Sequence, residues 1–247
     1  FILPNLLTLI GVCLGISSIK FALDQNYGLA VTFLIFAAIL DTLDGRIARL
    51  IKGTSEFGKE LDSLTDFVSF GIAPAFILYF WELKNYGKIG WAITLIFSVC
   101  CVLRLARFNL TKISEEAEWK RNYFEGVPSP AGAILILLPL IYELSEIQLD
   151  FDIIKFTPYL VIIVAVLLIS NIPTFSLKKI KISSQLTIFL LFGIIVIFVS
   201  LIFFTFKALL VLGLLYLLSI PVSYFLYKKT NKKLSKILNE EDHEDIL

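Results

Sequence analysis

Residues 25–81, QNYGLAVTFLIFAAILDTLDGRIARLIKGTSEFGKELDSLTDFVSFGIAPAFILYFW, contain two uncharged runs separated by a charged connection. The runs, 25–40 and 67–81, are each shorter than the roughly 20 residues that a helix needs to cross a bilayer core of about 30 Å. Each becomes long enough only if its helix continues into the charged residues beside it. Those residues are Asp41 and Asp44 after the first run and Asp62 and Asp66 before the second. The segment therefore predicts two membrane helices whose facing ends carry carboxylates.

The whole chain is too apolar for a soluble domain. Its 247 residues are 57% hydrophobic, with a mean hydropathy of +0.85, whereas about half apolar is usual for soluble domains. The charged residues, 17% of the chain, cluster and leave eight uncharged runs. We interpret these runs as an all-α, polytopic membrane bundle of about eight transmembrane helices. The runs are 1–19, 25–40, 67–81, 89–103, 126–142, 156–177, 182–206 and 208–227.

Three of the eight runs are too short, and the other five approach or exceed the required length. The third short run, 89–103, would have to continue through Arg104 and Arg107. We expect a transmembrane domain over 1–230 and a polar cytoplasmic tail over 231–247.

The distribution of basic residues predicts the orientation of the chain in the membrane. With eight spans both termini lie on one side, and 17 of the 22 Lys and Arg residues fall there. The positive-inside rule places that side in the cytoplasm, together with the acidic helix ends. We expect the run 1–19 to be a retained span rather than a signal peptide, because no basic segment precedes it. The basic residues on the other side are Lys20, Lys84, Lys88, Lys155 and Lys207.

The carboxylates of the two short spans form two stripes that predict a metal site. At 100° per residue, the first stripe consists of Asp41, Asp44, Gly45 and Ala48, and the second of Ser55, Gly58, Asp62 and Asp66. Carboxylates inside a membrane are costly and mark function by default, and they would repel one another unless neutralised. Oxygen ligands without nearby His or Cys favour hard cations such as Mg²⁺, Mn²⁺ or Ca²⁺. Two such ions can neutralise a pyrophosphate and activate an attacking oxygen.

Small and polar residues between the acids predict space for a nucleotide diphosphate. Gly45, Ala48 and Gly58 leave room beside the metals, although small residues also allow membrane helices to pack closely. Arg49 and Ser55 offer a guanidinium fork and a hydroxyl suited to phosphate or ribose oxygens. Together these residues indicate a nucleotide diphosphate site at the membrane surface.

The stretch 41–66 resembles the CDP-alcohol phosphotransferase family, because it contains every fixed position of the family signature. That signature is D-x2-D-G-x2-A-R-x8-G-x3-D-x3-D. The resemblance implies a homodimer, two divalent metal ions and Asp66 as the general base. It implies Asp41, Asp44, Asp62 and Asp66 as metal ligands. The CDP-lipid site would comprise Asn5 and Thr8 of the segment PNLLT, with Asp41, Gly45, Ala48, Arg49, Ser55 and Asp62.

Three further stretches are similar to segments of family members that use L-serine: DFVSFGIAP at 66–74, LRLARFN at 103–109 and FEGVPSPAGA at 124–133. The resemblance then implies transfer of a phosphatidyl group, or its ether-lipid equivalent, to the hydroxyl of L-serine. CMP is released and phosphatidylserine forms. The expected partners are CDP-diacylglycerol or CDP-archaeol, L-serine and membrane lipids, with no nucleic acid. The expected serine-binding residues are Arg104, Arg107, Asn109, Gly126 and Ser129.

Other interpretations of these residues stay open. Glycerol phosphate or inositol phosphate could replace serine, because by charge Arg104 and Arg107 suit a phosphate as well as a carboxylate. The same arginines could anchor the chain at the lipid headgroups, and Pro128 and Pro130 could simply begin a helix. An ion-coupled transporter would also carry intramembrane carboxylates, but its site would lie near the midplane rather than at helix ends.

Overall fold

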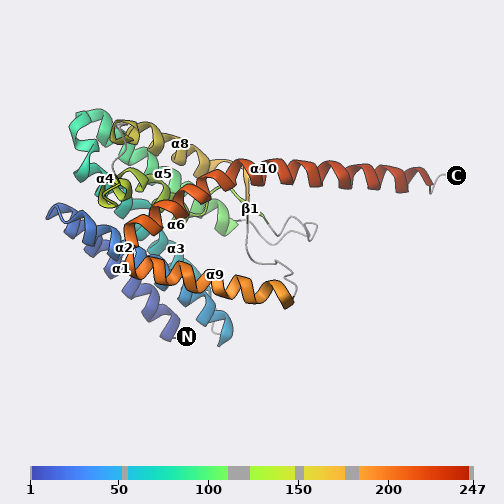
Figure 1. Cartoon of the computed structure of the whole chain (residues 1–247), viewed down its shortest axis with the longest axis horizontal. Coiled ribbons are helices and arrows are strands. Elements are labelled where there is room, and N and C mark those ends of the chain that lie inside the picture. Colours follow the sequence, from blue (N-terminus) through green and yellow to red (C-terminus); the bar gives the residue numbers. More distant parts are fainter. Residues whose placement is uncertain (1, 52–54, 111–122, 148–152, 176–183, 245–247) are drawn as a thin grey trace.

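The computed structural model describes residues 2–51, 55–110, 123–147, 153–175 and 184–244. Nearly all of these residues are helical, and the helices pack side by side as a bundle (Figure 1). The helical membrane fold predicted from the sequence is confirmed.

The first two helices, α1 (Ile2–Leu23) and α2 (Tyr27–Leu50), form a hairpin and lie side by side (Figure 1). The turn between them ends at Asn26, whose side chain accepts a hydrogen bond from the N–H of Leu29 and caps α2. Because the two helices run in opposite directions, the beginning of α1 lies beside the end of α2. This arrangement brings Thr8 next to Asp44.

The next span joins three helical segments without a break. These are α3 (Glu56–Asp66), the π-helical turn η1 (Phe67–Ile72) and α4 (Ala73–Trp81). The π-helical turn begins directly after Asp66. Such turns occur often at functional sites, because the widened backbone redirects the neighbouring side chains.

The fourth span, α5 (Gly87–Leu110), follows the 3₁₀ turn η2 (Leu83–Tyr86) and continues past Arg104 and Arg107. Each of the three short runs therefore lies within a helix that continues into the neighbouring charged residues. Helix α2, the span from α3 to α4, and the span that includes η2 and α5 are all long and apolar enough to cross a membrane. The extension predicted from the sequence is confirmed.

The run 126–142, which has nearly the length of a full span, is divided into two short helices. These are α6 (Ser129–Ile136) and α7 (Leu138–Leu144). Pro139 lies in the first turn of α7. Because proline has no N–H and its ring displaces the preceding turn, it ends one helix and begins the next.

The run 156–177 forms a helix only in its first part, so the prediction of one continuous helix is wrong here. The 3₁₀ turn η4 (Ile153–Phe156) leads into α8 (Thr157–Ile169). Beyond the end of α8, the chain forms the strand β2 (Pro173–Phe175). This strand pairs antiparallel with β1 (Tyr123–Glu125). The residue before a proline disfavours the helical conformation, which is consistent with an extended backbone entering Pro173.

The last two helices are α9 (Ser184–Phe203) and α10 (Thr205–Glu244). Within the described residues, five helical spans are long and apolar enough to cross a membrane, and the last is Thr205–Thr230. All eight predicted runs lie at least partly on helices, in the predicted order. Helix α10 is continuous through residue 230, so the domain boundary there stays a prediction, and residues 245–247 lie outside the described part.

The centre of the bundle is built around η1. Phe70 of η1 and Phe97 of α5 are among its largest fully buried side chains. Helix α1 approaches η1 so closely that a Cβ at Gly15 would lie 2.6 Å from the Ser69 hydroxyl oxygen. A glycine at this position allows the contact. The packing fixes η1, and with it the adjoining Asp66, against α1 and α5.

Candidate active site

Three carboxylates from two spans converge at one end of the bundle. One carboxylate oxygen each from Asp41 of α2 and from Asp62 and Asp66 of α3 lie within 4.8 Å of one another. We call this group the acidic cluster. Asp62 and Asp66 share one face of α3 because they are four residues apart. The structure thus brings together three of the four predicted metal ligands.

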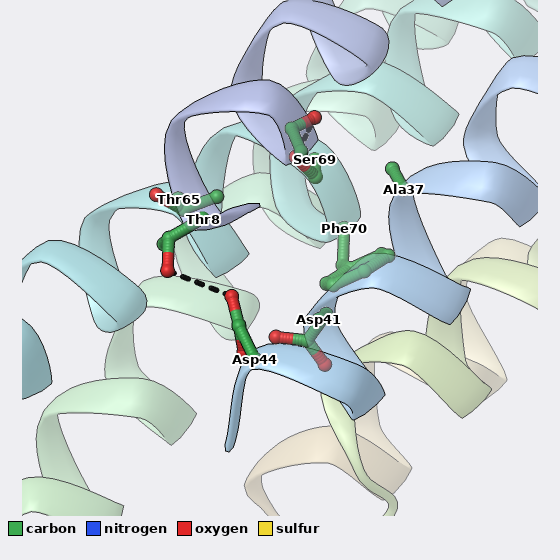
Figure 2. A pocket seen from close by; sticks show the side chains of 8 residues that line it. Thr8, Ala37, Asp41, Asp44, Thr65, Ser69 and Phe70 are labelled. Carbon is green, nitrogen blue, oxygen red and sulfur yellow. Dashed lines mark hydrogen bonds between the residues drawn. The ribbon is translucent and has the colours of Figure 1, made fainter. Parts of the chain in front are cut away.

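The fourth predicted ligand, Asp44, lies beside the cluster and has a protein partner. Its carboxylate accepts a 2.7 Å hydrogen bond from the hydroxyl of Thr8, as Figure 2 shows. Asp44 is only 3% exposed. A buried carboxylate needs such a donor. Thr8 therefore orients Asp44, whether or not Thr8 also touches a substrate.

A pocket opens between the acids and α1 (Figure 2). The carboxylate of Asp41 points into the region between Asp44 and Phe70. The pocket is lined by Thr8, Gly11, Ala37, Asp41, Asp44, Thr65, Ser69 and Phe70.

The chemistry of the acidic cluster fits hard divalent cations. Asp66 Oδ1 is buried and has no hydrogen-bond partner among the described residues. The two ion pairs found in the described part of the chain, Lys20–Asp24 and Lys59–Glu56, leave the cluster's carboxylates unpaired. Converging carboxylates that are not paired with basic residues need a cation, and oxygen-only ligands suit Mg²⁺, Mn²⁺ or Ca²⁺. Asp41, Asp62 and Asp66 could hold such an ion.

The end of α2 is open beside the cluster. A Cβ added at Gly45 would meet no atom within 4 Å, and the neighbouring Ala48 is half-buried. Arg49 is exposed, and its Nε donates a 2.9 Å hydrogen bond to the carbonyl of Gly45. The space predicted beside Gly45 is therefore present.

The other predicted CDP-lipid residues meet at the beginning of α3. Ser55 is its N-cap, and its hydroxyl accepts a 3.0 Å hydrogen bond from the N–H of Gly58. A Cβ at Gly58 would lie 3.3 Å from Asn5 Oδ1, so the first turn of α1 reaches the same place. Ser55 therefore has a structural role as a cap, and binding of a nucleotide by Ser55 and Asn5 stays a prediction.

On the other side of the cluster, two predicted serine-binding residues contact each other. Arg104 Nη1 of α5 donates a 2.5 Å hydrogen bond to the hydroxyl of Ser129, which is fully buried at the beginning of α6. Arg104 is also close enough to Asp66 for their charges to interact. The structure thus brings Arg104 and Ser129 to the acidic cluster.

Arg107 and Asn109 have different surroundings. Arg107 Nη1 donates 2.7 Å hydrogen bonds to the carbonyl of Ile169 and to Asn171 Oδ1, and so ties α5 to the end of α8. Asn109 Nδ2 donates a 2.9 Å hydrogen bond to Ser63 on α3. A cation at the last carbonyls of a helix stabilises it, so Arg107 has a structural role, and serine binding by both residues stays a prediction.

Gly126 also has a role in the fold. Its φ is +73°, and a Cβ there would lie 2.8 Å from the carbonyl oxygen of Ser170 and 2.9 Å from that of Leu168. Its N–H donates a 2.9 Å hydrogen bond to the carbonyl of Ile172. The left-handed conformation and the backbone contacts both require glycine.

We therefore expect Gly126→Ala to lower the free energy of unfolding by about 2 kcal/mol or more. The matched control is Gly193→Ala, because a Cβ at Gly193 meets no atom within 4 Å. That control should keep or slightly raise stability, because Gly193 lies inside α9 and alanine is the better helix former. Thermal unfolding midpoints in detergent measure both effects, and equal midpoints for the two variants would contradict this account.

Two polar residues near Arg104 were not predicted from the sequence. Tyr216 of α10 and Thr174 of β2 lie near each other, and Tyr216 is close enough to Arg104 for their side chains to interact electrostatically. Tyr216 lies in an apolar run without a motif, and Thr174 lies in a segment predicted to be helical. The only available signal was a tyrosine on the inward face of a membrane helix.

The fold and the site together define a helical membrane protein with an acidic cluster at the ends of two adjoining spans. A sequence model described as CDP-alcohol phosphatidyltransferase matches residues 1–169. The chain belongs to this family.

Several relatives are named CDP-diacylglycerol–serine O-phosphatidyltransferase. The one from Helicobacter pylori is 36% identical over 203 residues, which cover 82% of this chain and 82% of that protein. The one from Mycobacterium leprae is 44% identical over 137 residues, covering 55% of this chain and 45% of that protein. The one from Mycobacterium bovis is 38% identical over 173 residues, which cover 70% of this chain and 60% of that protein. The chain thus spans about half the length of the mycobacterial relatives.

Proposed function

We propose that the protein transfers a phosphatidyl group from CDP-diacylglycerol, or its ether-lipid equivalent from CDP-archaeol, to the hydroxyl of L-serine. The observation that carries the proposal is the acidic cluster, in which one oxygen from each carboxylate lies within 4.8 Å of the others. The chain that holds it belongs to the CDP-alcohol phosphatidyltransferase family. The names of the relatives support serine as the acceptor.

In the proposed reaction, the serine oxygen attacks the phosphorus that carries the lipid. A bond forms between that oxygen and phosphorus, the bond from phosphorus to the CMP oxygen breaks, and CMP leaves with the electron pair. Asp66 takes the proton of the serine hydroxyl, because its Oδ1 is buried and has no hydrogen-bond partner among the described residues. The one histidine of the sequence, His243, belongs to the polar tail, so a carboxylate is the better candidate for the base.

Two divalent ions, Mg²⁺, Mn²⁺ or Ca²⁺, would neutralise the pyrophosphate charge when bound. Asp41, Asp62 and Asp66 would hold them, with Asp44 completing the set. The carboxylate of Asp44 has two oxygens, and the hydrogen bond from Thr8 engages Oδ2. A carboxylate has about four acceptor positions, so this hydrogen bond leaves others for a cation.

We propose that the CDP moiety lies along the open end of α2. Gly45 offers unfilled space, and Ala48 adds little bulk. Arg49 is exposed and could exchange its hydrogen bond to the Gly45 carbonyl for one to a phosphate. Asn5, Thr8 and Ser55 would border the same site from α1 and the beginning of α3.

We propose that serine enters from the side of Arg104 and Ser129. Arg104 offers a positive charge close to Asp66, which suits a molecule with a carboxylate at one end and a hydroxyl at the other. Arg107, Asn109 and Gly126 would shape the entrance. The positive-inside distribution supports a cytoplasmic location for the termini and this site, and the family resemblance supports a homodimer.

The test is an acceptor panel with purified protein and labelled CDP-diacylglycerol in mixed micelles with Mn²⁺ or Mg²⁺. We expect labelled phosphatidylserine with L-serine, and at most trace products with glycerol 3-phosphate, inositol 1-phosphate or ethanolamine. Preference for a phosphorylated acceptor would overturn serine as the substrate but keep the reaction class. No lipid product with any acceptor would overturn the reaction itself.

A further inference from the structure

A second group of polar residues, two of them buried and two half-buried, extends the acidic cluster into the bundle. It contains Arg104 of α5, Ser129 of α6, Thr174 of β2 and Tyr216 of α10, and we call it the inner polar group. Arg104 lies close enough to both Asp66 and Tyr216 for electrostatic interaction, so it connects the two ends of the site. The inner polar group therefore begins where the acidic cluster ends.

Three atoms along this path are buried and have no hydrogen-bond partner within the part of the chain that the structure describes. They are Asp66 Oδ1, Arg104 Nε and the hydroxyl oxygen of Tyr216. The neighbouring polar groups are satisfied: Ser129 accepts from Arg104 Nη1, and Thr174 donates to the carbonyl of Gly126. Buried polar atoms without partners are rare in native proteins, and three from three separate helices in one region point to a bound molecule.

The chemistry of the three atoms specifies what that molecule must offer. Arg104 Nε–H can only donate, and the phenol of Tyr216 can donate beside it. A carboxylate has two oxygens that can accept both hydrogen bonds, whereas an ammonium group would be repelled by Arg104. Asp66 Oδ1 at the other end accepts, so it matches a hydroxyl. A small hydroxy acid fits this order of donors and acceptor.

The placement of Tyr216 follows from the packing of α10. One face of this helix is formed by Leu209, Gly213, Tyr216, Ile220 and Ser223, which are three or four positions apart. All of them are buried except Tyr216, which is half-buried. Helix α10 packs against β2, α6 and α7. It lies outside residues 1–169, the part that matches the family model.

We propose that Tyr216 is a specificity-determining residue, whose hydroxyl donates to the carboxylate of the amino-acid acceptor beside Arg104. This inference rests on the proposed function and deepens it, because it assigns the carboxylate end of the acceptor to α10. Tyr216 lies on the inward face of α10, close enough to Arg104 for electrostatic interaction. Asp66 and the acidic cluster lie at the reacting end.

The test is Tyr216→Phe, which removes the hydroxyl and keeps the ring. We expect the KM for L-serine to rise about tenfold or more, as for loss of a hydrogen bond to a charged group. The KM for CDP-diacylglycerol and kcat at saturating serine should stay within about twofold. The matched control is Tyr224→Phe, a tyrosine on the exposed face of α10, which should leave all three constants unchanged.

A second acceptor separates recognition from a purely structural effect. L-Serinamide lacks the carboxylate, so the wild type should prefer L-serine strongly, and Tyr216→Phe should reduce that preference about tenfold. An unchanged preference with an unchanged serine KM would overturn the assignment of Tyr216 and leave the proposed function intact. A wild type that transfers nothing to serine would overturn both. If Tyr216→Phe lowered thermal stability and reduced activity with L-serine and with L-serinamide equally, Tyr216 would only support the fold. That result would also overturn the assignment.

Discussion

Replacement of Asp66 by asparagine is expected to lower kcat by about a thousandfold, a loss typical of removing a general base. Asparagine has nearly the same shape as aspartate but cannot take the proton of the acceptor hydroxyl. In the structure Asp66 ends α3, immediately before the π-helical turn, and its Oδ1 is buried without a protein partner in the described residues. Single-turnover kinetics with labelled L-serine measure the chemical step directly.

Binding of CDP-diacylglycerol by Asp66→Asn separates proton transfer from loss of the site. We expect the donor to bind within about tenfold of the wild-type affinity, because Asp41 and Asp62 still provide carboxylates. The matched control is Asp24→Asn, which changes an exposed aspartate paired with Lys20 outside the site. Wild-type turnover by Asp66→Asn with the donor bound would show that another group takes the proton.

Removal of divalent metal is expected to reduce turnover to the rate without enzyme, and added Mg²⁺, Mn²⁺ or Ca²⁺ should restore it. Three carboxylates within 4.8 Å of one another cannot all stay ionised beside an anionic pyrophosphate without a cation. The measurement is turnover in excess EDTA, followed by titration with each metal. Full turnover in EDTA would contradict the metal site.

Variants of the acidic cluster test the same site by metal binding alone. Asp41→Asn and Asp62→Asn should each weaken Mn²⁺ binding by about a hundredfold or more, since loss of only an outer partner already costs about 10–100-fold. Glu60→Gln is the matched control, because Glu60 is an exposed carboxylate on α3 next to Asp62 but outside the cluster. Calorimetric titration with Mn²⁺ detects the difference without any substrate. Equal affinity for Mn²⁺ in the wild type, Asp41→Asn and Asp62→Asn would place the metal elsewhere.

The acidic site could be predicted from the sequence because its geometry depends on local spacing. Asp41 follows an apolar run that is too short to cross a membrane, so its helix had to continue into the charged segment, and α2 does so as far as Leu50. Asp62 and Asp66 lie four residues apart on the next helix, and helical geometry alone puts them on one face. Convergence of the two helices then gave the cluster.

Features that depend on contacts between distant segments could not be predicted in this way. The pairing of β1 with β2 joins residues about fifty positions apart, and no local pattern indicated it. The hydrogen bond of Thr8 to Asp44 likewise depends on how closely α1 and α2 pack. Tyr216 reaches the inner polar group only because α10 packs against β2, and its surrounding sequence is uniformly apolar.

The central claim is that this acidic site moves a phosphatidyl group from a cytidine diphosphate lipid to serine. The most direct measurement is a count of both products in one reaction of the purified protein with labelled L-serine and CDP-diacylglycerol. The account predicts one CMP for every phosphatidylserine formed, and formation of both products about a thousandfold more slowly by Asp66→Asn. Release of CMP without phosphatidylserine, or formation of phosphatidylserine without CMP, would contradict it.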